Sequence, residues 1–243
     1  MKKVLFFVLF LVCLVSSEAF AEDLAISTGA GLRKMTEELC VAYRADTGRK
    51  VQEMYGGNMG QILSQVKAGS GVSVVISDKG TLDASKAGVK FETFQPLGNT
   101  ALVLAWRKGL RITSPADLEK AEIKSVCYPD PKAAIYGRAA AKFLESSGIG
   151  AKIAPKVAQI ATVPQVFSYL ATGEMDAGFI NRVVARAGKD KLGGSLEIAE
   201  GYPPLHMVAA VVENASGNPE VQAFLAFLKT PKARQIMKKH GIW

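Results

Sequence analysis

The sequence has few of the side chains that enzymes most often use for catalysis. It contains two histidines, His206 and His240, and three cysteines without a Cys-x-x-Cys pair, so metal ligation through imidazole and thiolate groups is poorly supplied. No serine stands in a Gly-x-Ser-x-Gly motif, and no Gly-Lys-Ser/Thr sequence completes a phosphate-binding loop. We therefore expect no catalytic residue, no cofactor and no bound metal cation.

Long runs of like charge are also absent. The 30 Lys and Arg residues are scattered among 22 Asp and Glu residues, which gives a formal net charge of +8. The basic residues are not interleaved with aromatic ones, so we expect no nucleic-acid partner. A diffuse positive field can still attract small anions.

No apolar run is long enough to cross a membrane as a helix. The longest, Val4–Val15, is shorter than the about 20 residues that a spanning helix needs. Two lysines precede it and Ala19-Phe20-Ala21 follows it. This pattern predicts a signal peptide over residues 1–21, cleaved after Ala21 during export, with a retained signal anchor as the alternative. Cys13 lies inside the apolar run, which argues against a lipid anchor there.

The exported chain keeps two cysteines, Cys40 and Cys127. An oxidising compartment permits a disulfide between them. Two cysteines do not form a disulfide framework, however, and we expect both to be buried as small apolar side chains.

Short apolar runs alternate with amphipathic segments along the rest of the chain. The pattern predicts strands over 24–27, 51–55, 72–76, 101–106, 125–128, 177–180 and 207–212. It predicts helices over 32–46, 59–68, 133–147, 164–172, 219–228 and 231–240, and a short one that opens at Ser114-Pro115. This alternation indicates an α/β fold with mostly parallel sheets covered on both faces. No Pro/Gly-rich linker divides the chain, so strands would join two lobes, and the best crossover candidates are the apolar runs 101–106 and 207–212.

Candidate binding segments lie where strands lead into helices, because open parallel sheets bind ligands at the carboxyl ends of their strands. Four junctions qualify: Ser27–Gly31, Tyr55–Gly60, Tyr128–Pro131 leading to Ala134–Gly137, and Ala161–Pro164. Free N–H groups at a helix start attract anions, and glycine lets the backbone approach a ligand closely. The basic residues that border the junctions are Arg33, Lys34, Lys132, Arg138 and Arg182. Whether Arg182, or Asp130 as the only carboxylate inside a junction, contacts a ligand stays open.

In their order and spacing these segments resemble the periplasmic molybdate-binding proteins of ABC importers, over the whole exported chain. The matching features are Gly31-Leu32, Val66–Gly69 before Ile76-Ser77, Pro129-Asp130-Pro131 before Tyr136-Gly137, Thr162-Val163, and the ending Phe224-Leu225 through Pro231 to Gly241. The resemblance implies a type II periplasmic binding protein fold, with two α/β lobes, a two-strand hinge and a ligand cleft between the lobes. It places lobe 1 over residues 22–102 and 207–243, and lobe 2 over 103–206.

The resemblance also implies which residues hold the ligand. The family grips a dehydrated tetrahedral oxyanion with backbone N–H and hydroxyl groups. By position, the contacts here are Thr28, Gly29, Ala30, Gly31, Gly57, Asn58, Met59, Ala134, Ile135, Val163 and Asn181. Gly31 replaces a serine of the family pattern, Gly57–Gly60 replaces a serine-rich loop, and Asn181 replaces a tyrosine. Thr28, Asn58 and Asn181 are the side chains that would supply donors instead.

The function that follows is capture of a small oxyanion, such as molybdate or tungstate, for an ABC permease in the inner membrane. We expect a monomeric binding protein that is not an enzyme. The alternatives are the same fold binding another small solute or serving a sensor, and a secreted hydrolase. A gene neighbourhood with a permease and an ATPase would favour transport, and one with a histidine kinase would favour sensing.

Overall fold

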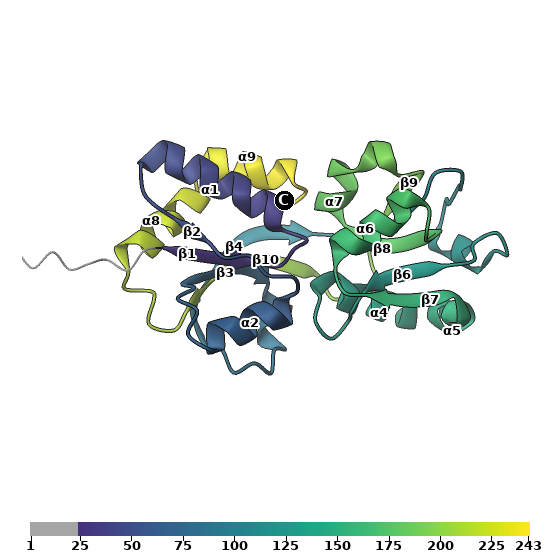
Figure 1. Ribbon diagram of the computed structural model, residues 1–243, viewed down its shortest axis with the longest axis horizontal. Coiled ribbons are helices and arrows are strands. Elements are labelled where there is room, and N and C mark those ends of the chain that lie inside the picture. The colour runs from purple at the N-terminus through teal and green to yellow at the C-terminus, as the bar shows by residue number, and fades with distance from the viewer. Residues whose placement is uncertain (1–23) are drawn as a thin grey trace, which may run out of the picture.

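The computed structural model describes residues 24–243, which form two α/β lobes side by side (Figure 1). The predicted signal peptide and its cleavage site lie outside the described residues. Each lobe is built on one five-stranded sheet. The predicted two-lobed α/β architecture is therefore confirmed.

The first sheet has the strand order β2-β1-β3-β10-β4. Its strands are β1 (Ala25–Thr28), β2 (Gln52–Glu53), β3 (Val74–Asp78), β4 (Phe91–Thr100) and β10 (Leu205–Val212). β1 pairs in parallel with β2 and β3, whereas β10 runs antiparallel to β3 and β4. The sheet therefore mixes both pairings, and its antiparallel strands are those next to the chain crossings.

Helices cover both faces of the first sheet (Figure 1). One face carries α1 (Arg33–Thr47), α8 (Pro219–Leu228) and α9 (Pro231–Lys239), and the other carries α2 (Met59–Lys67) and α3 (Lys79–Asp83). Side chains along a strand alternate between the two faces. Accordingly, Val74 and Ile76 join the core under α1, and Val75 packs with Ile62 of α2 and Leu82 of α3.

The second sheet has the strand order β7-β6-β8-β5-β9. Its strands are β5 (Leu102–Trp106), β6 (Val126–Pro129), β7 (Val157–Ile160), β8 (Ala177–Asn181) and β9 (Gly194–Ile198). β6 is parallel to β7 and β8, and β5 is antiparallel to β8 and β9. The helices of this lobe are α4 (Ile135–Ser146), α5 (Ile149–Ile153), α6 (Val163–Thr172) and α7 (Arg182–Ala187), with 3-10 turns at Pro115–Glu119, Ala154–Lys156 and Lys189–Lys191.

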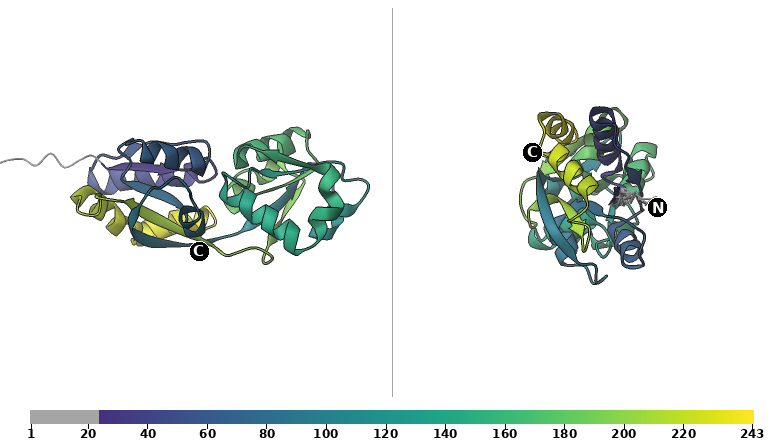
Figure 2. Two further views of the ribbon diagram at one scale, coloured as in Figure 1. Left: turned by 90° about the horizontal axis from the view of Figure 1, so that it is seen from below. Right: turned by 90° about the vertical axis from the view of Figure 1, so that its left-hand side faces the viewer.

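The chain passes between the sheets twice, once between Thr100 and Leu102 and once between Ile198 and Leu205. Figure 2 shows the lobes as two bodies joined by these two segments. The predicted crossover runs 101–106 and 207–212 adjoin the crossings. Neither β5 nor β10 spans both sheets, since each pairs along its whole length within one sheet.

Cys40 and Cys127 are both buried and unpaired. Cys40 lies in α1 and Cys127 in β6, so the two thiols belong to different lobes. Burial raises the pKa of each thiol to about 12, which leaves them protonated at neutral pH. They pack as small apolar side chains, as the sequence predicts.

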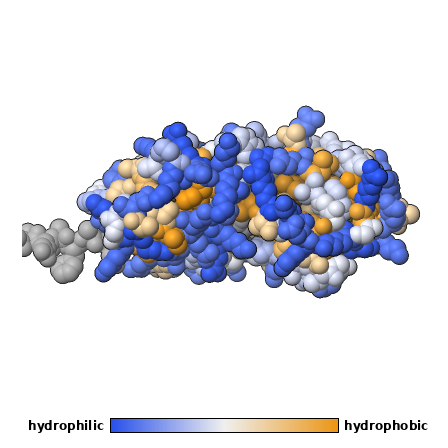
Figure 3. All heavy atoms as spheres, turned by 90° about the horizontal axis from the view of Figure 1, so that it is seen from above, coloured by the Kyte–Doolittle hydropathy of each residue, from blue (hydrophilic) through white to orange (hydrophobic). Residues whose placement is uncertain are grey.

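On the face seen from above, hydrophilic side chains cover much of both lobes and apolar patches lie scattered between them (Figure 3). Within residues 24–243, no helix has both the length and the apolar character needed to cross a membrane.

Candidate functional site

A small pocket lies at the seam, the contact region between the two lobes. Its volume is about 30 Å³. Because a single water needs roughly 10–15 Å³ on the same measure, the pocket suits a compact ligand. The lining comes from all four predicted strand-to-helix junctions: Gly29, Ala30, Gly31, Leu32, Gly57, Asn58, Met59, Ala134, Ile135, Tyr136, Ala161, Thr162 and Val163.

Three helices begin at this lining: α2 at Met59, α4 at Ile135 and α6 at Val163. The N–H groups of a first helical turn have no partner within the helix, and the helix dipole adds partial positive charge at that end. In the described part of the chain, none of the lining residues carries a charged side chain. The site would therefore hold an anion through helix ends and backbone donors rather than through an ion pair.

Some of the backbone donors at the pocket already have partners. The Ala30 N–H donates to the Gly57 carbonyl at 3.1 Å, which ties the first two junctions together. The Met59 N–H donates to the Ala133 carbonyl, also at 3.1 Å, and this bond crosses from the first lobe to the second. The N–H groups that make no hydrogen bond within residues 24–243 include those of Gly31, Ile135 and Val163. These three remain for a ligand.

Asn58 has a structural role beside any contact with a ligand. It is the N-cap of α2, where its Oδ1 accepts from the Gln61 N–H at 3.0 Å while its own N–H donates to Gln61 Oε1 at 3.2 Å. This reciprocal pair is a capping box. No hydrogen bond within residues 24–243 uses the Asn58 Nδ2, so that amide can still donate into the pocket.

Nine of the eleven predicted contact residues line the pocket, and Thr28 and Asn181 do not. The Thr28 hydroxyl is buried and donates to the Ile76 carbonyl at 2.7 Å. Asn181 is also buried: its Oδ1 caps α7 by accepting from the Val184 N–H at 2.7 Å, and its Nδ2 donates to the Gly31 carbonyl at 2.8 Å. In this structure, protein partners thus use two of the three predicted side-chain donors, Thr28 and Asn181.

The two departures from the family pattern at positions 31 and 181 lie in contact with each other. A Cβ added at Gly31 would stand 2.9 Å from Asn181 Nδ2 and 3.5 Å from the Val163 Cβ. The first distance is too short for any side chain at position 31 unless Asn181 moves. Glycine at 31 and asparagine at 181 therefore fit each other, and together they close the seam beside the pocket.

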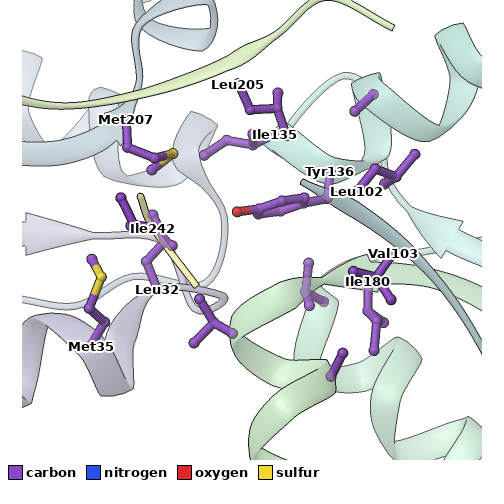
Figure 4. Close-up of a cluster of buried hydrophobic side chains, with 14 of the residues drawn as sticks. Leu32, Met35, Leu102, Val103, Ile135, Tyr136, Ile180, Leu205, Met207 and Ile242 are labelled. Atoms are coloured by element: carbon purple, nitrogen blue, oxygen red, sulfur yellow. The ribbon is translucent and has the colours of Figure 1, made fainter. Parts of the chain in front are cut away.

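Sequence reasoning did not assign a ligand contact to four of the lining residues: Leu32, Tyr136, Ala161 and Thr162. Tyr136 is the informative one, because its ring extends from α4 toward the side of the first lobe where Met207 and Ile242 lie (Figure 4). Its side chain is almost fully buried, its hydroxyl has no hydrogen-bond partner among the described residues, and burial raises its pKa above the ordinary value. The Tyr136-Gly137 pair was the available signal, but sequence alone does not show where the ring points.

Comparison with known proteins identifies the family. The model of the bacterial extracellular solute-binding protein family matches residues 24–242. The chain belongs to this family. Among its relatives, the molybdate-binding protein ModA of Rhodobacter capsulatus is 26% identical over 233 residues, covering 92% of this chain and 89% of that one. The ModA of Azotobacter vinelandii is 27% identical over 236 residues, covering 94% and 92%. The predicted resemblance is thus confirmed.

A solved structure supports the same fold for this solute-binding protein. The periplasmic molybdate-binding protein of Azotobacter vinelandii superposes with a TM-score of 0.79 at 22% identity, covering 91% of this chain and 99% of that one. Similarity of this degree over nearly the whole of both chains establishes the two-lobed periplasmic binding protein fold.

The sequence did not decide whether Asp130 and Arg182 contact a ligand, and in this solute-binding protein both side chains have partners away from the pocket. Neither lines the pocket. The Asp130 Oδ1 accepts from the Lys132 N–H at 2.8 Å within its own turn. The Arg182 guanidinium lies 3.4 Å from the centre of the Trp243 ring and pairs with Glu197. Within residues 24–243, no group of three or more His, Cys, Asp and Glu residues is arranged to hold a metal ion.

Proposed function

We propose that this solute-binding protein captures a tetrahedral oxyanion, molybdate or tungstate, in the pocket between its lobes. The observation that carries the proposal is the convergence of three helix N-termini on one compact pocket without a charged side chain. Such an oxyanion only accepts hydrogen bonds, and it matches a lining whose available polar groups are mostly N–H donors. The names of the two ModA relatives support the same ligand.

The donor-rich lining favours these ions over phosphate. Phosphate near neutral pH keeps a proton that needs an acceptor, and an unmatched buried polar group is unfavourable. The Asn58 Oδ1 already accepts from Gln61, and the Asp130 carboxylate does not line the pocket. We therefore expect phosphate to bind more weakly than molybdate or tungstate.

A thermal-shift screen of oxyanions, metal cations and small organic acids tests the ligand class. A ligand at 100 times its dissociation constant adds about 2.7 kcal/mol to the free energy of unfolding. We expect molybdate and tungstate to raise the melting temperature, and phosphate to raise it less at equal concentration. A screen in which no oxyanion shifts the melting temperature would exclude the proposed ligand class.

The proposed setting is transport. The exported protein loses residues 1–21, works as a monomer in the periplasm and passes its unaltered ligand to an ABC permease. The lobes, predicted over 22–102 with 207–243 and over 103–206, would close on the ligand by rotation at the two crossing segments. The strands shift these bounds slightly, because Leu102 already belongs to the second sheet and Leu205 to the first. Mass spectrometry of periplasmic protein should find an N-terminus at Glu22. A retained N-terminus, or a lipid on Cys13, would contradict a soluble periplasmic form.

A further inference from the structure

Arg138 links the two lobes next to the pocket. It stands in the first turn of α4, three residues after Ile135, whose N–H is open to a ligand. Its side chain reaches the first lobe, where Nη2 hydrogen-bonds the Thr81 hydroxyl and lies 3.4 Å from the Asp78 Oδ2. Asp78 ends β3, and Thr81 belongs to α3. The same helical turn therefore lines the pocket and binds the opposite lobe.

The acceptor of this contact is a nearly buried carboxylate. The Asp78 side chain is 3% exposed. Its Oδ2 accepts from the Thr81 N–H at 2.9 Å and from the Thr81 hydroxyl at 3.0 Å, which caps α3. Among the described residues, Arg138 is the only cationic side chain within ion-pair distance of Asp78. A buried carboxylate is strongly unfavourable without a compensating charge, and here that charge comes from the other lobe.

We propose that Arg138 is a positioning residue for ligand binding, a role that rests on the proposed function. By pairing with Asp78 and Thr81, it holds the first turn of α4 against the first lobe and keeps the Ile135 N–H at the ligand. Separation of the lobes breaks this pair, so the pair opposes opening and slows release of the ligand. The Arg138 side chain is 36% exposed, but Asp78 is buried. Removal of Arg138 therefore leaves a buried carboxylate without its cation, and such a loss acts mainly on the dissociation rate.

The test compares Arg138→Gln with Lys142→Gln. Lys142 lies on the same helix, is exposed and pairs with Glu145 one turn away, so its replacement removes an equal charge without touching the seam. With molybdate as the probe, stopped-flow measurement should show dissociation about tenfold faster for Arg138→Gln, as expected for a lost hydrogen bond to a charged group. The association rate should change little. Lys142→Gln should match the unaltered protein, and Arg138→Lys should recover part of the loss.

A ligand-free measurement separates this inference from the proposed function. Small-angle scattering without ligand should give a larger radius of gyration for Arg138→Gln than for Lys142→Gln, at equal melting temperatures. If the unaltered protein binds no oxyanion, the proposed function fails, and equal radii would then overturn the role of Arg138. If molybdate binds, equal dissociation rates for the two variants would overturn it.

Discussion

At the scale of single residues, Asn58 caps α2 and lines the pocket, so substitution can separate its capping role from the binding role that we propose. Asn58→Ala removes the cap of α2, and loss of an N-cap costs about 1 kcal/mol of stability. Asn58→Asp keeps an acceptor for the Gln61 N–H, but it removes the Nδ2 donor and adds a negative charge at the pocket. We expect Asn58→Asp to unfold in urea like the unaltered protein while losing most oxyanion affinity. If calorimetry shows normal affinity for both variants, Asn58 does not contact the ligand.

Gly31 offers a second test at the residue scale. Gly31→Ala places a Cβ against Asn181 Nδ2, so the hydrogen bond from Asn181 to the Gly31 carbonyl must break or the seam must widen. One hydrogen bond contributes about 0.5–1.5 kcal/mol, so we expect affinity for molybdate to fall by up to about tenfold. The double variant Gly31→Ala with Asn181→Ala should relieve the clash and unfold no more easily than Asn181→Ala alone. If Gly31→Ala has normal affinity for molybdate and a normal free energy of unfolding, the seam accommodates the added Cβ at no measurable energetic cost.

Sequence reasoning at this scale located the pocket but not the use of each polar group. The glycine-rich junctions were recognisable because a helix start after a strand is a local pattern. The partners of Thr28 and Asn181 are not local: the Thr28 hydroxyl bonds a carbonyl 48 residues away, and Asn181 bonds one 150 residues away. Only the folded structure shows that these two donors are already occupied.

At the scale of elements, Asp176 holds the strands of the second sheet together. It precedes β8, and its carboxylate accepts from the Lys124 N–H at 2.6 Å, the Ser125 N–H at 3.1 Å and the Arg107 Nε at 2.7 Å. The start of β6 and the end of β5 are thus fixed to the same side chain. Burial acts to raise the pKa of Asp176, but the Arg107 contact and the two backbone donors outweigh it and lower the pKa.

The lowered pKa gives a pH test of this arrangement. A carboxylate with a depressed folded-state pKa contributes stability above its unfolded pKa of about 3.9, and that contribution is lost as the pH falls through the folded pKa. Asp176→Asn should lower the free energy of unfolding at pH 7 by about 1–3 kcal/mol. Urea unfolding between pH 3 and 5 should also show a weaker pH dependence in this variant. An unchanged pH dependence would mean that Asp176 contributes little to acid sensitivity.

The sequence was informative about long periodic elements and weak on irregular ones. The prediction of a helix over 32–46 agrees with α1 to within one residue at each end, because its apolar spacing is regular. β4 was not predicted, since its ten residues include Pro96 and Gly98 and show no clean alternation. Pairing with β10 holds β4 in place despite a register shift between Met207 and Val208. The formation of β4 therefore depends on its pairing with β10 and not on its local sequence pattern.

At the scale of the whole molecule, the division into lobes depends on pairings that local patterns do not contain. β4 and β10 pair although more than a hundred residues separate Thr100 from Leu205, and the chain changes sheets just after the first residue and just before the second. Periodicity gave the α/β class, and the family resemblance gave the two lobes. The structure adds the crossings and the contacts that join the lobes beside the pocket: Met59 with Ala133, Asn181 with Gly31, and Arg138 with Asp78.

Competitive calorimetry on the exported form of the protein tests the central claim most directly. Molybdate, tungstate, sulfate and phosphate would be titrated at one neutral pH, first singly and then in competition. We expect one molybdate or tungstate ion per chain, bound more tightly than phosphate. The N–H groups of Gly31, Ile135 and Val163 can donate to an oxyanion, whereas the Asn58 Oδ1 already accepts from Gln61 and Asp130 does not line the pocket, so neither of these oxygens serves a phosphate proton. Tighter binding of phosphate, or no binding of any of the four ions, would contradict the assignment of the pocket to a fully deprotonated oxyanion.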